Sequence, residues 1–244
     1  MATAPAATPA NPFSTRFVRP DEMTYRFAAG QDADAVAAAT LTQLTRRGAA
    51  AIIGPHGSGK STLLHTLAPR LSGVFPRVEW LRLHATGDAV QPLRHWQREQ
   101  AAIGAAAAPQ ATCLVVDGFE QLPWAVRLQL TWRSWRAATG RKRPTVLQPY
   151  LLVTAHRPQL GIQTVYRTGW NAALVHSLTA EKLGDLPEPE RQTMLRVAEQ
   201  LAERFAQRRP ADRNVRDYWF SLYDEYERLR PSNSFAATRR RNAQ

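Results

Sequence analysis

Short apolar runs alternate with longer segments of helical spacing through the middle of the chain. The runs predict five strands, and the third is apolar at every position, as expected for a strand covered on both faces of a sheet. Because helix-length segments separate the strands, the pattern favours a parallel, doubly wound α/β sheet. The expected strands are 49–53, 78–83, 112–116, 150–154 and 173–178, and the expected helices among them are 60–71, 91–107 and 122–138.

Helices without intervening strands are expected on both sides of this region. Asp32 can cap a helix that runs through about residue 47, because its carboxylate can accept hydrogen bonds from the first turn. After the last expected strand, 187–208 and 214–229 predict two more helices, and no strand lies between them. These two helices indicate a small helical part that follows the α/β core.

The N-terminal residues show neither pattern. Residues 1–12 are mostly small residues and prolines, which predict a disordered tail. Between 11 and 27, Phe13, Phe17, Tyr25 and Phe27 are spaced irregularly among arginines, and we expect them to pack on the surface of the following domain. The chain is therefore divided into an N-terminal tail and surface segment (1–27), an α/β core (28–180), a C-terminal helical part (181–231) and a basic tail (232–244).

Composition limits the class of protein. The chain has 244 residues, of which 44% are hydrophobic, so a sizeable core can be buried. No apolar run approaches the roughly 18 residues of a spanning helix, and the first residues lack the pattern of a secretory signal. A single cysteine, Cys113, excludes an intrachain disulfide framework and a cysteine-rich metal site. We expect a soluble, cytoplasmic protein.

The charge balance is strongly basic. Lys and Arg number 32 against 20 Asp and Glu, which gives a net charge of +12, and only three of the positive residues are lysines. A basic surface attracts polyanions, so Arg141, Lys142 and Arg143, in the loop before the fourth expected strand, are candidate contacts for nucleic acid or an acidic protein. A solvated loop in an arginine-rich chain is the alternative. No membrane partner is expected, and copies of the same chain are a further candidate partner.

Four large apolar residues recur at helical spacing within 122–138. They are Trp124, Leu128, Trp132 and Trp135. This spacing predicts packing against the core rather than a platform on which bases stack.

The strongest motif follows the first expected strand. It matches G-x-x-x-x-G-K-[ST] at every fixed position, with a strand before it and a helix after it, which is the context the motif requires. Glycines let backbone N–H groups surround a phosphate chain, and the start of the helix directs its positive end at the same anion. Lys60 would reach the β- and γ-phosphates, and the Ser61 hydroxyl would bind Mg²⁺. The residues expected to bind nucleotide are Gly54, Pro55, His56, Gly57, Ser58, Gly59, Lys60, Ser61 and Thr62.

A second segment combines an apolar strand with a terminal carboxylate. The sequence CLVVD ends at Asp117, about sixty residues after the glycine-rich loop, and resembles a Walker B segment whose aspartate binds magnesium. Glycine follows Asp117 where many such ATPases have a glutamate. Glu120 lies three residues after Asp117 and could polarise the attacking water instead. Its alternative role is to interact with the dipole of the following helix.

The end of the fourth expected strand supplies the last candidates. In the run LLVTAHR, Thr154 fits a polar residue beside the γ-phosphate, provided that its strand lies between those that carry the two motifs. His156 is a weaker candidate, because a single loop histidine is more often structural.

Taken together, GPHGSGKST, CLVVD and LLVT resemble the P-loop NTPases of the additional-strand class, which includes AAA-type, STAND and ABC ATPases. The resemblance covers 49–178 and implies the strand order 2-3-4-1-5. An ABC signature is absent. The segment Asn214-Val215-Arg216-Asp217 is similar to the run that carries the sensor 2 arginine in some AAA ATPases, so Arg216 would contact the phosphates. An arginine at a helix start in an arginine-rich chain is the alternative.

The resemblance implies an Mg-dependent ATPase that couples ATP hydrolysis to a conformational change acting on a protein or nucleic-acid partner. Lys60, Glu120 and Thr154 would take part in the reaction, and Ser61 and Asp117 would bind the metal. ATP is preferred over GTP because no guanine-recognition motif is present. The alternative function is a nucleotide-gated binding module with little or no hydrolysis, suggested by Gly118 next to Asp117.

Overall fold

The computed structural model describes residues 11–14, 23–28, 30–83, 89–106, 111–139 and 149–229. It divides into two compact units. One comprises 20–169, and the other combines the first 19 residues with 170–244. Each unit is described by itself.

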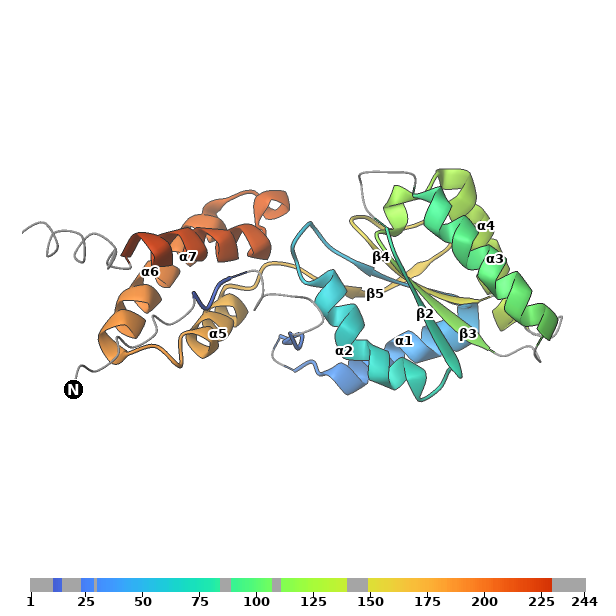
Figure 1. Ribbon diagram of the computed structural model, residues 1–244, viewed down its shortest axis with the longest axis horizontal. Helices are drawn as coiled ribbons and strands as arrows, with labels where there is room; N and C mark the ends of the chain where they lie inside the picture. Colours follow the sequence, from blue (N-terminus) through green and yellow to red (C-terminus); the bar gives the residue numbers. More distant parts are fainter. Residues whose placement is uncertain are drawn as a thin grey trace, which may run out of the picture. The chain divides into compact units, whose positions relative to one another are not determined.

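The 20–169 unit contains a five-stranded parallel sheet in the order β2-β3-β4-β1-β5 (Figure 1). All four neighbouring pairs of strands are parallel. This order is the one that the resemblance implied, with β4 inserted between β3 and β1, and it confirms the α/β fold of a P-loop NTPase. The strands are β1 (Ala49–Ile53), β2 (Arg77–Arg82), β3 (Thr112–Asp117), β4 (Tyr150–Ala155) and β5 (Gln163–Arg167).

Helices cover both faces of the sheet, which explains why its central strands are continuously apolar. On β3, Cys113 and Val115 face the layer of α1 and α2, whereas Leu114 and Val116 face the layer of α3 and α4. The first layer comprises α1 (Ala33–Arg47) and α2 (Lys60–Ser72), and the second comprises α3 (Val90–Ala106) and α4 (Trp124–Ala138), which follows the short 3-10 helix η2 (Phe119–Gln121).

The C-terminal helices form a core of their own. Tyr218 and Leu222 of α7 are fully buried against Met194 and Phe205 of α6. The elements of this unit are α5 (Ala172–Lys182), α6 (Glu188–Gln207), the 3-10 helix η3 (Pro210–Asp212) and α7 (Val215–Leu229).

The expected strand at 173–178 is wrong, because these residues lie in α5. The Asn171 side chain accepts a hydrogen bond from the Leu174 N–H and caps this helix. A short apolar run fits a buried helix as well as a strand. The fifth strand is β5 instead, at the edge of the sheet, where its residues are only partly buried and therefore lack an apolar run.

The expected packing of the N-terminal aromatics holds for only some of them. Tyr25 and Phe27 pack on the α1 and α2 layer. Phe13, however, is buried in the helical unit, with its ring centroid 5.5 Å from that of Trp219 and 6.5 Å from that of Tyr226. Of the tail expected at 1–12, residues 1–10 lie outside the described residues, as do the tail at 232–244 and Phe17. Asn11 does not fit the expected tail, because it is buried and its side-chain amide donates to the Glu227 carboxylate at 2.7 Å.

The prediction that the aromatic residues of α4 pack in the core is also wrong. Trp124, Leu128, Trp132 and Trp135 are exposed, whereas α4 packs inward through Leu130, Ser134 and Ala137. Small side chains on the inner face allow α4 to approach the neighbouring backbone, as Gly48 lies directly against the Ser134 carbonyl. Within the described part of the chain, no helix is long and apolar enough to cross a bilayer.

Candidate functional site

The glycine-rich loop connects the end of β1 to the start of α2. Its glycines are required by the backbone, because Gly57 and Gly59 have φ angles of 64° and 88°, which side chains disfavour. Gly54 is required by space, since a Cβ there would lie 2.2 Å from the Thr168 hydroxyl oxygen. The loop therefore keeps an open curve of backbone N–H groups in front of α2, as an anion site needs.

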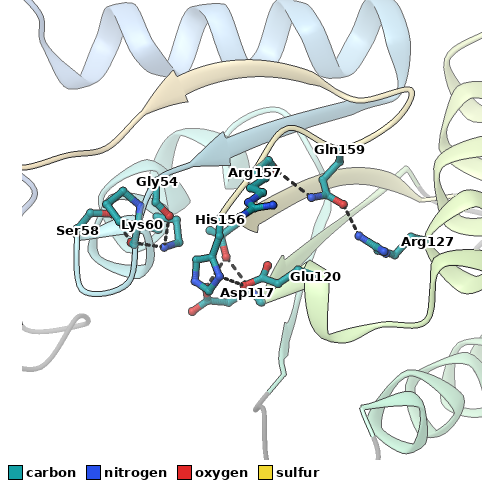
Figure 2. A network of polar contacts seen from close by, with 12 residues as sticks. Gly54, Ser58, Lys60, Asp117, Glu120, Arg127, His156, Arg157 and Gln159 are labelled. Carbon is teal, nitrogen blue, oxygen red and sulfur yellow. Dashed lines mark hydrogen bonds and ion pairs between the residues drawn. The ribbon is translucent and has the colours of Figure 1, made fainter. Parts of the chain in front are cut away.

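The side chains of Lys60 and Ser58 hydrogen-bond to backbone carbonyls of the same loop. The Lys60 Nζ donates to the carbonyls of Gly54, at 2.8 Å, and Pro55, at 2.7 Å (Figure 2). Ser58 is buried and donates to the same Pro55 carbonyl at 2.8 Å. A lysine ammonium held over this loop can exchange these carbonyls for phosphate oxygens.

Thr168, which follows β5, contacts the loop through the Ser58 side chain. Its hydroxyl oxygen lies 2.6 Å from the Ser58 hydroxyl oxygen and 3.4 Å from the Ile53 carbonyl oxygen. The sequence pattern did not indicate this residue, because it predicts the fifth strand at 173–178. A correct assignment of β5 beside β1 would have put Thr168 next to the loop.

Three oxygen-bearing side chains meet where β3 and β4 end. Asp117 accepts from the Ser61 hydroxyl at 2.7 Å and from the Thr154 hydroxyl at 2.6 Å, one bond at each carboxylate oxygen. Thr154 is fully buried and also accepts from the Gly118 N–H at 2.9 Å. Ser61 and Asp117 together offer the hydroxyl and carboxylate that suit Mg²⁺ beside a phosphate chain.

No cluster of three or more His, Cys, Asp or Glu side chains that could hold a metal occurs among the described residues. Mg²⁺ commonly keeps one or two protein ligands and completes its shell with phosphate oxygens and water. The pair Ser61 and Asp117 fits that requirement.

A turn at Gly118 brings Glu120 back toward this site. Gly118 has a φ of 90°, and η2 starts directly after it. The Glu120 Oε1 lies 3.2 Å from the Nδ1 of His156 (Figure 2). Its Oε2 is buried and has no hydrogen-bond partner within the described residues. The Glu120 side chain is thus oriented through Oε1, whereas Oε2 is a buried acceptor whose hydrogen-bonding capacity is unused among the described residues.

His156 lies among several charges. Burial is the largest influence and lowers its pKa, the Glu120 carboxylate opposes this, and Lys60 and His56 lower the pKa further. The ring centroids of His56 and His156 are 3.8 Å apart. At neutral pH the imidazole is therefore neutral, and its contact with Glu120 is a hydrogen bond rather than an ion pair. His56 belongs to the glycine-rich loop and His156 follows β4, so this ring contact joins the loop to the end of β4.

A cleft of about 470 Å³ opens beside Glu120 and His156. Trp124, Leu128 and Leu160 supply apolar walls, and Arg127 donates to the Gln159 side chain at 2.7 Å. The sequence gives no local signal for this cleft, because its walls come from two segments that are far apart in the chain.

The remaining candidates divide into three groups. Thr62 lies in the first turn of α2, beside the motif. Arg216 is exposed at the start of α7, in the helical unit, where its N–H donates to the Asn214 side chain. Arg141, Lys142 and Arg143 lie outside the described residues.

Replacing Gly118 by alanine tests the turn that carries Glu120. A Cβ at this position would meet the Leu83 carbonyl oxygen at 2.9 Å, in a backbone conformation that disfavours side chains. We expect a loss of about 1 to 2 kcal/mol in the free energy of unfolding, measured by urea denaturation. Gly73→Ala is the matched control, because Gly73 has a φ of −71° and no contact closer than 3.5 Å. Equal free energies of unfolding for Gly118→Ala and Gly73→Ala would contradict the requirement for glycine at position 118.

Comparison with known proteins adds only distant likenesses. No family model and no curated protein matches the chain. Among solved structures it is similar to PCH-2 of C. elegans, at 12% identity over 80% of this chain and 68% of that one, with a TM-score of 0.39. It is also similar to the replication initiator DnaA bound to AMPPCP and single-stranded DNA, at 15% identity, with coverage of 89% and 67% and a TM-score of 0.48.

A third similar structure is a DNA replication initiation factor, at 14% identity over 85% of this chain and 63% of that one, with a TM-score of 0.48. With TM-scores below 0.5, these likenesses carry no argument about fold or function. The function of the chain has to be inferred from its strand order and from the side chains of the site.

Proposed function

We propose that this chain binds Mg-ATP and hydrolyses it, and that hydrolysis changes its conformation and acts on a partner. One observation carries the proposal. The glycine-rich loop, the Ser61–Asp117 pair and the Glu120 carboxylate converge at the carboxyl ends of β1, β3 and β4 (Figure 2). This is the edge of a parallel sheet at which α/β proteins bind ligands.

Each residue has a separate task in this proposal. The backbone N–H groups of the loop and the Lys60 ammonium bind the phosphate oxygens. Ser61 and Asp117 bind magnesium, which when present neutralises charge on the phosphates. Thr154 orients the Asp117 carboxylate through its 2.6 Å hydrogen bond and presents its hydroxyl beside the terminal phosphate. The sequence resemblance also makes Arg216 a candidate for a phosphate contact.

Glu120 is proposed to polarise the attacking water. The Gly118 turn compensates for the missing glutamate directly after Asp117, because it returns the chain so that Glu120 lies beside His156. In this proposal Oε2, which is buried and has no hydrogen-bond partner among the described residues, accepts a proton from the attacking water, while His156 positions the carboxylate through Oε1. This geometry favours hydrolysis over the alternative of a gated module without turnover.

The direct test is phosphate release by the purified protein. We expect ATP-dependent release in Mg²⁺ that falls to background when EDTA removes the metal, because Ser61 and Asp117 bind phosphate only through the metal. Asp117→Asn should show the same loss in the presence of Mg²⁺, with Asp185→Asn, an exposed position in the helical unit, as control. The assay is run with and without DNA and at several protein concentrations. Release that is insensitive to EDTA would contradict the proposal.

A further inference from the structure

The first described segment of the chain docks on the C-terminal helices. Asn11 is 6% exposed and Phe13 is 1% exposed. The Asn11 side chain contacts Glu227, which is 216 residues away in the sequence. Both ends of this contact lie in the same compact unit, because the first 19 residues cluster with 170–244. We call the segment 11–14 the arm.

The arm has a shape that its own four residues encode. The Asn11 side-chain oxygen accepts from the Phe13 N–H at 3.0 Å, and the Asn11 carbonyl accepts from the Ser14 N–H at 3.1 Å. Asparagine favours the first position of such a turn because its side chain can accept this bond, and Pro12 at the second position fixes the φ that the turn needs. An exposed Asn-Pro-Phe segment of another protein can therefore adopt the same turn.

One side of α7 receives this turn at two points. The Phe13 ring lies against two aromatic rings, at centroid distances of 5.5 Å and 6.5 Å. The Asn11 amide donates to a backbone carbonyl at 3.2 Å and to a carboxylate at 2.7 Å. The α7 residues that make these contacts are spaced so that they lie along one side of the helix. We call them the α7 site, which comprises Trp219, Tyr223, Tyr226 and Glu227.

Two side chains of the arm carry its contact with α7. Within the described part of the chain, the hydrogen bonds from the arm to α7 come from the Asn11 side chain, and Phe13 supplies the apolar contact. The α7 site is held from its other side, because the Trp219 ring packs on Tyr218, whose hydroxyl donates to the Ala198 carbonyl at 3.3 Å. A few anchoring side chains of this kind dominate recognition between proteins.

The α7 site selects for both anchors. Its aromatic rings fit an aromatic side chain, which pairs with them edge-on or tilted. The Glu227 carboxylate accepts from the asparagine amide, whereas the carboxylate of an aspartate at the same place would be repelled. The ligand that this chemistry describes is an uncharged turn with an amide donor and, two residues later, an aromatic ring.

We propose that the α7 site recognises an Asn-Pro-Phe turn of a partner protein, and that the arm occupies the site until such a partner displaces it. The arm is a tethered competitor, since its covalent link to the chain gives it a high effective concentration at the site. Occupation by the arm therefore sets a threshold that the concentration or the additional contacts of the partner must exceed. Recognition requires no nucleotide, so this proposal is independent of the proposed hydrolysis.

The test uses a fluorescein-labelled peptide that copies residues 6–18 and the full-length, nucleotide-free protein. Asn11→Ala with Phe13→Ala in the protein vacates the α7 site. Fluorescence anisotropy should show that this vacated variant binds the peptide, and that the wild type binds it at least about 10-fold more weakly because its own arm competes. The same peptide with Phe13→Ala should bind the vacated variant roughly 30-fold or more weakly. Circular dichroism checks that the variant is folded.

Exchange of charge at Glu227 locates the binding. A peptide with Asn11→Asp should bind the vacated variant about 10-fold or more weakly, since two carboxylates would then face each other. Adding Glu227→Gln to the vacated variant should recover affinity for this peptide, because the glutamine amide can donate to the aspartate. Asp224→Asn is the matched control, since it removes the same charge from an exposed position of α7 outside the α7 site and should recover nothing.

A second vacated protein covers the case in which loss of Phe13 unfolds the helices. Asn11→Asp in the full-length protein keeps the ring and disrupts the polar anchor alone, and it should bind the wild-type peptide more tightly than the wild-type protein does. Folded vacated proteins that do not bind the peptide would make the arm a permanent part of the helical core and overturn the proposal. Equal binding of the Phe13→Ala peptide would do the same. A dimeric wild type, measured by light scattering, that becomes monomeric in the vacated variant would assign the α7 site to the arm of a second copy instead.

Discussion

Lys60→Ala will abolish tight ATP binding and leave the 20–169 unit folded. Its ammonium now donates to the Gly54 and Pro55 carbonyls, and in the nucleotide complex it would donate to phosphate oxygens instead. Each charge-assisted bond of this kind contributes about 1.5 to 3 kcal/mol, so losing two weakens binding by roughly 100-fold or more. The side chain belongs to none of the hydrophobic clusters of the sheet, so its removal leaves no cavity in the core.

The measurement is titration with a fluorescent ATP analogue, with circular dichroism to confirm the fold. Lys182→Ala is the matched control, since it removes the same charge from α5 in the helical unit. We expect that control to bind ATP as the wild type does. Unchanged affinity in a folded Lys60→Ala protein would refute the assignment of the glycine-rich loop as a phosphate site.

The fold could be predicted where local pattern and burial agree. The central strands β1, β3 and β4 are buried on both faces and therefore appear as continuous apolar runs. The edge strand β5 has neither an apolar run nor strict alternation, because one side lacks a neighbouring strand and its residues are half-buried. Because β5 gave no signal, the fifth strand was predicted at 173–178 instead. Those residues form α5, and their apolar side chains pack against α6 and α7.

The position of the glycine-rich loop was predictable from the sequence, but its surroundings were not. Spacing alone places Lys60 and Ser61 at the start of α2, directly after this loop, because the motif depends on consecutive residues. The support from Thr168 depends on which strands are neighbours, and so does the Glu120–His156 contact, which joins two loops that are distant in the sequence. Exposure of the α4 tryptophans could not be predicted because helical spacing is the same whether a face packs inward or outward.

Glu120→Gln will reduce turnover by about 100-fold or more while ATP still binds. The substitution keeps the shape of the side chain and its contact with the His156 imidazole, but an amide cannot accept a proton from water. Oε2, which is buried and has no hydrogen-bond partner in the described part of the chain, is the atom whose basicity is lost. Because the proposal assigns Glu120 to the attacking water rather than to the phosphates, nucleotide affinity should stay close to that of the wild type.

The assay compares steady-state phosphate release with ATP affinity for Glu120→Gln and for Glu99→Gln, which alters an exposed glutamate of α3 paired with His95. Only the first should lose turnover. His156→Ala separates positioning from chemistry, since it removes the partner of Oε1 and leaves Oε2 in place, so a smaller loss than in Glu120→Gln is expected. Turnover that survives in Glu120→Gln would remove Glu120 from the reaction. Absence of turnover in the wild type, with and without DNA and at every protein concentration, would instead favour the nucleotide-gated module.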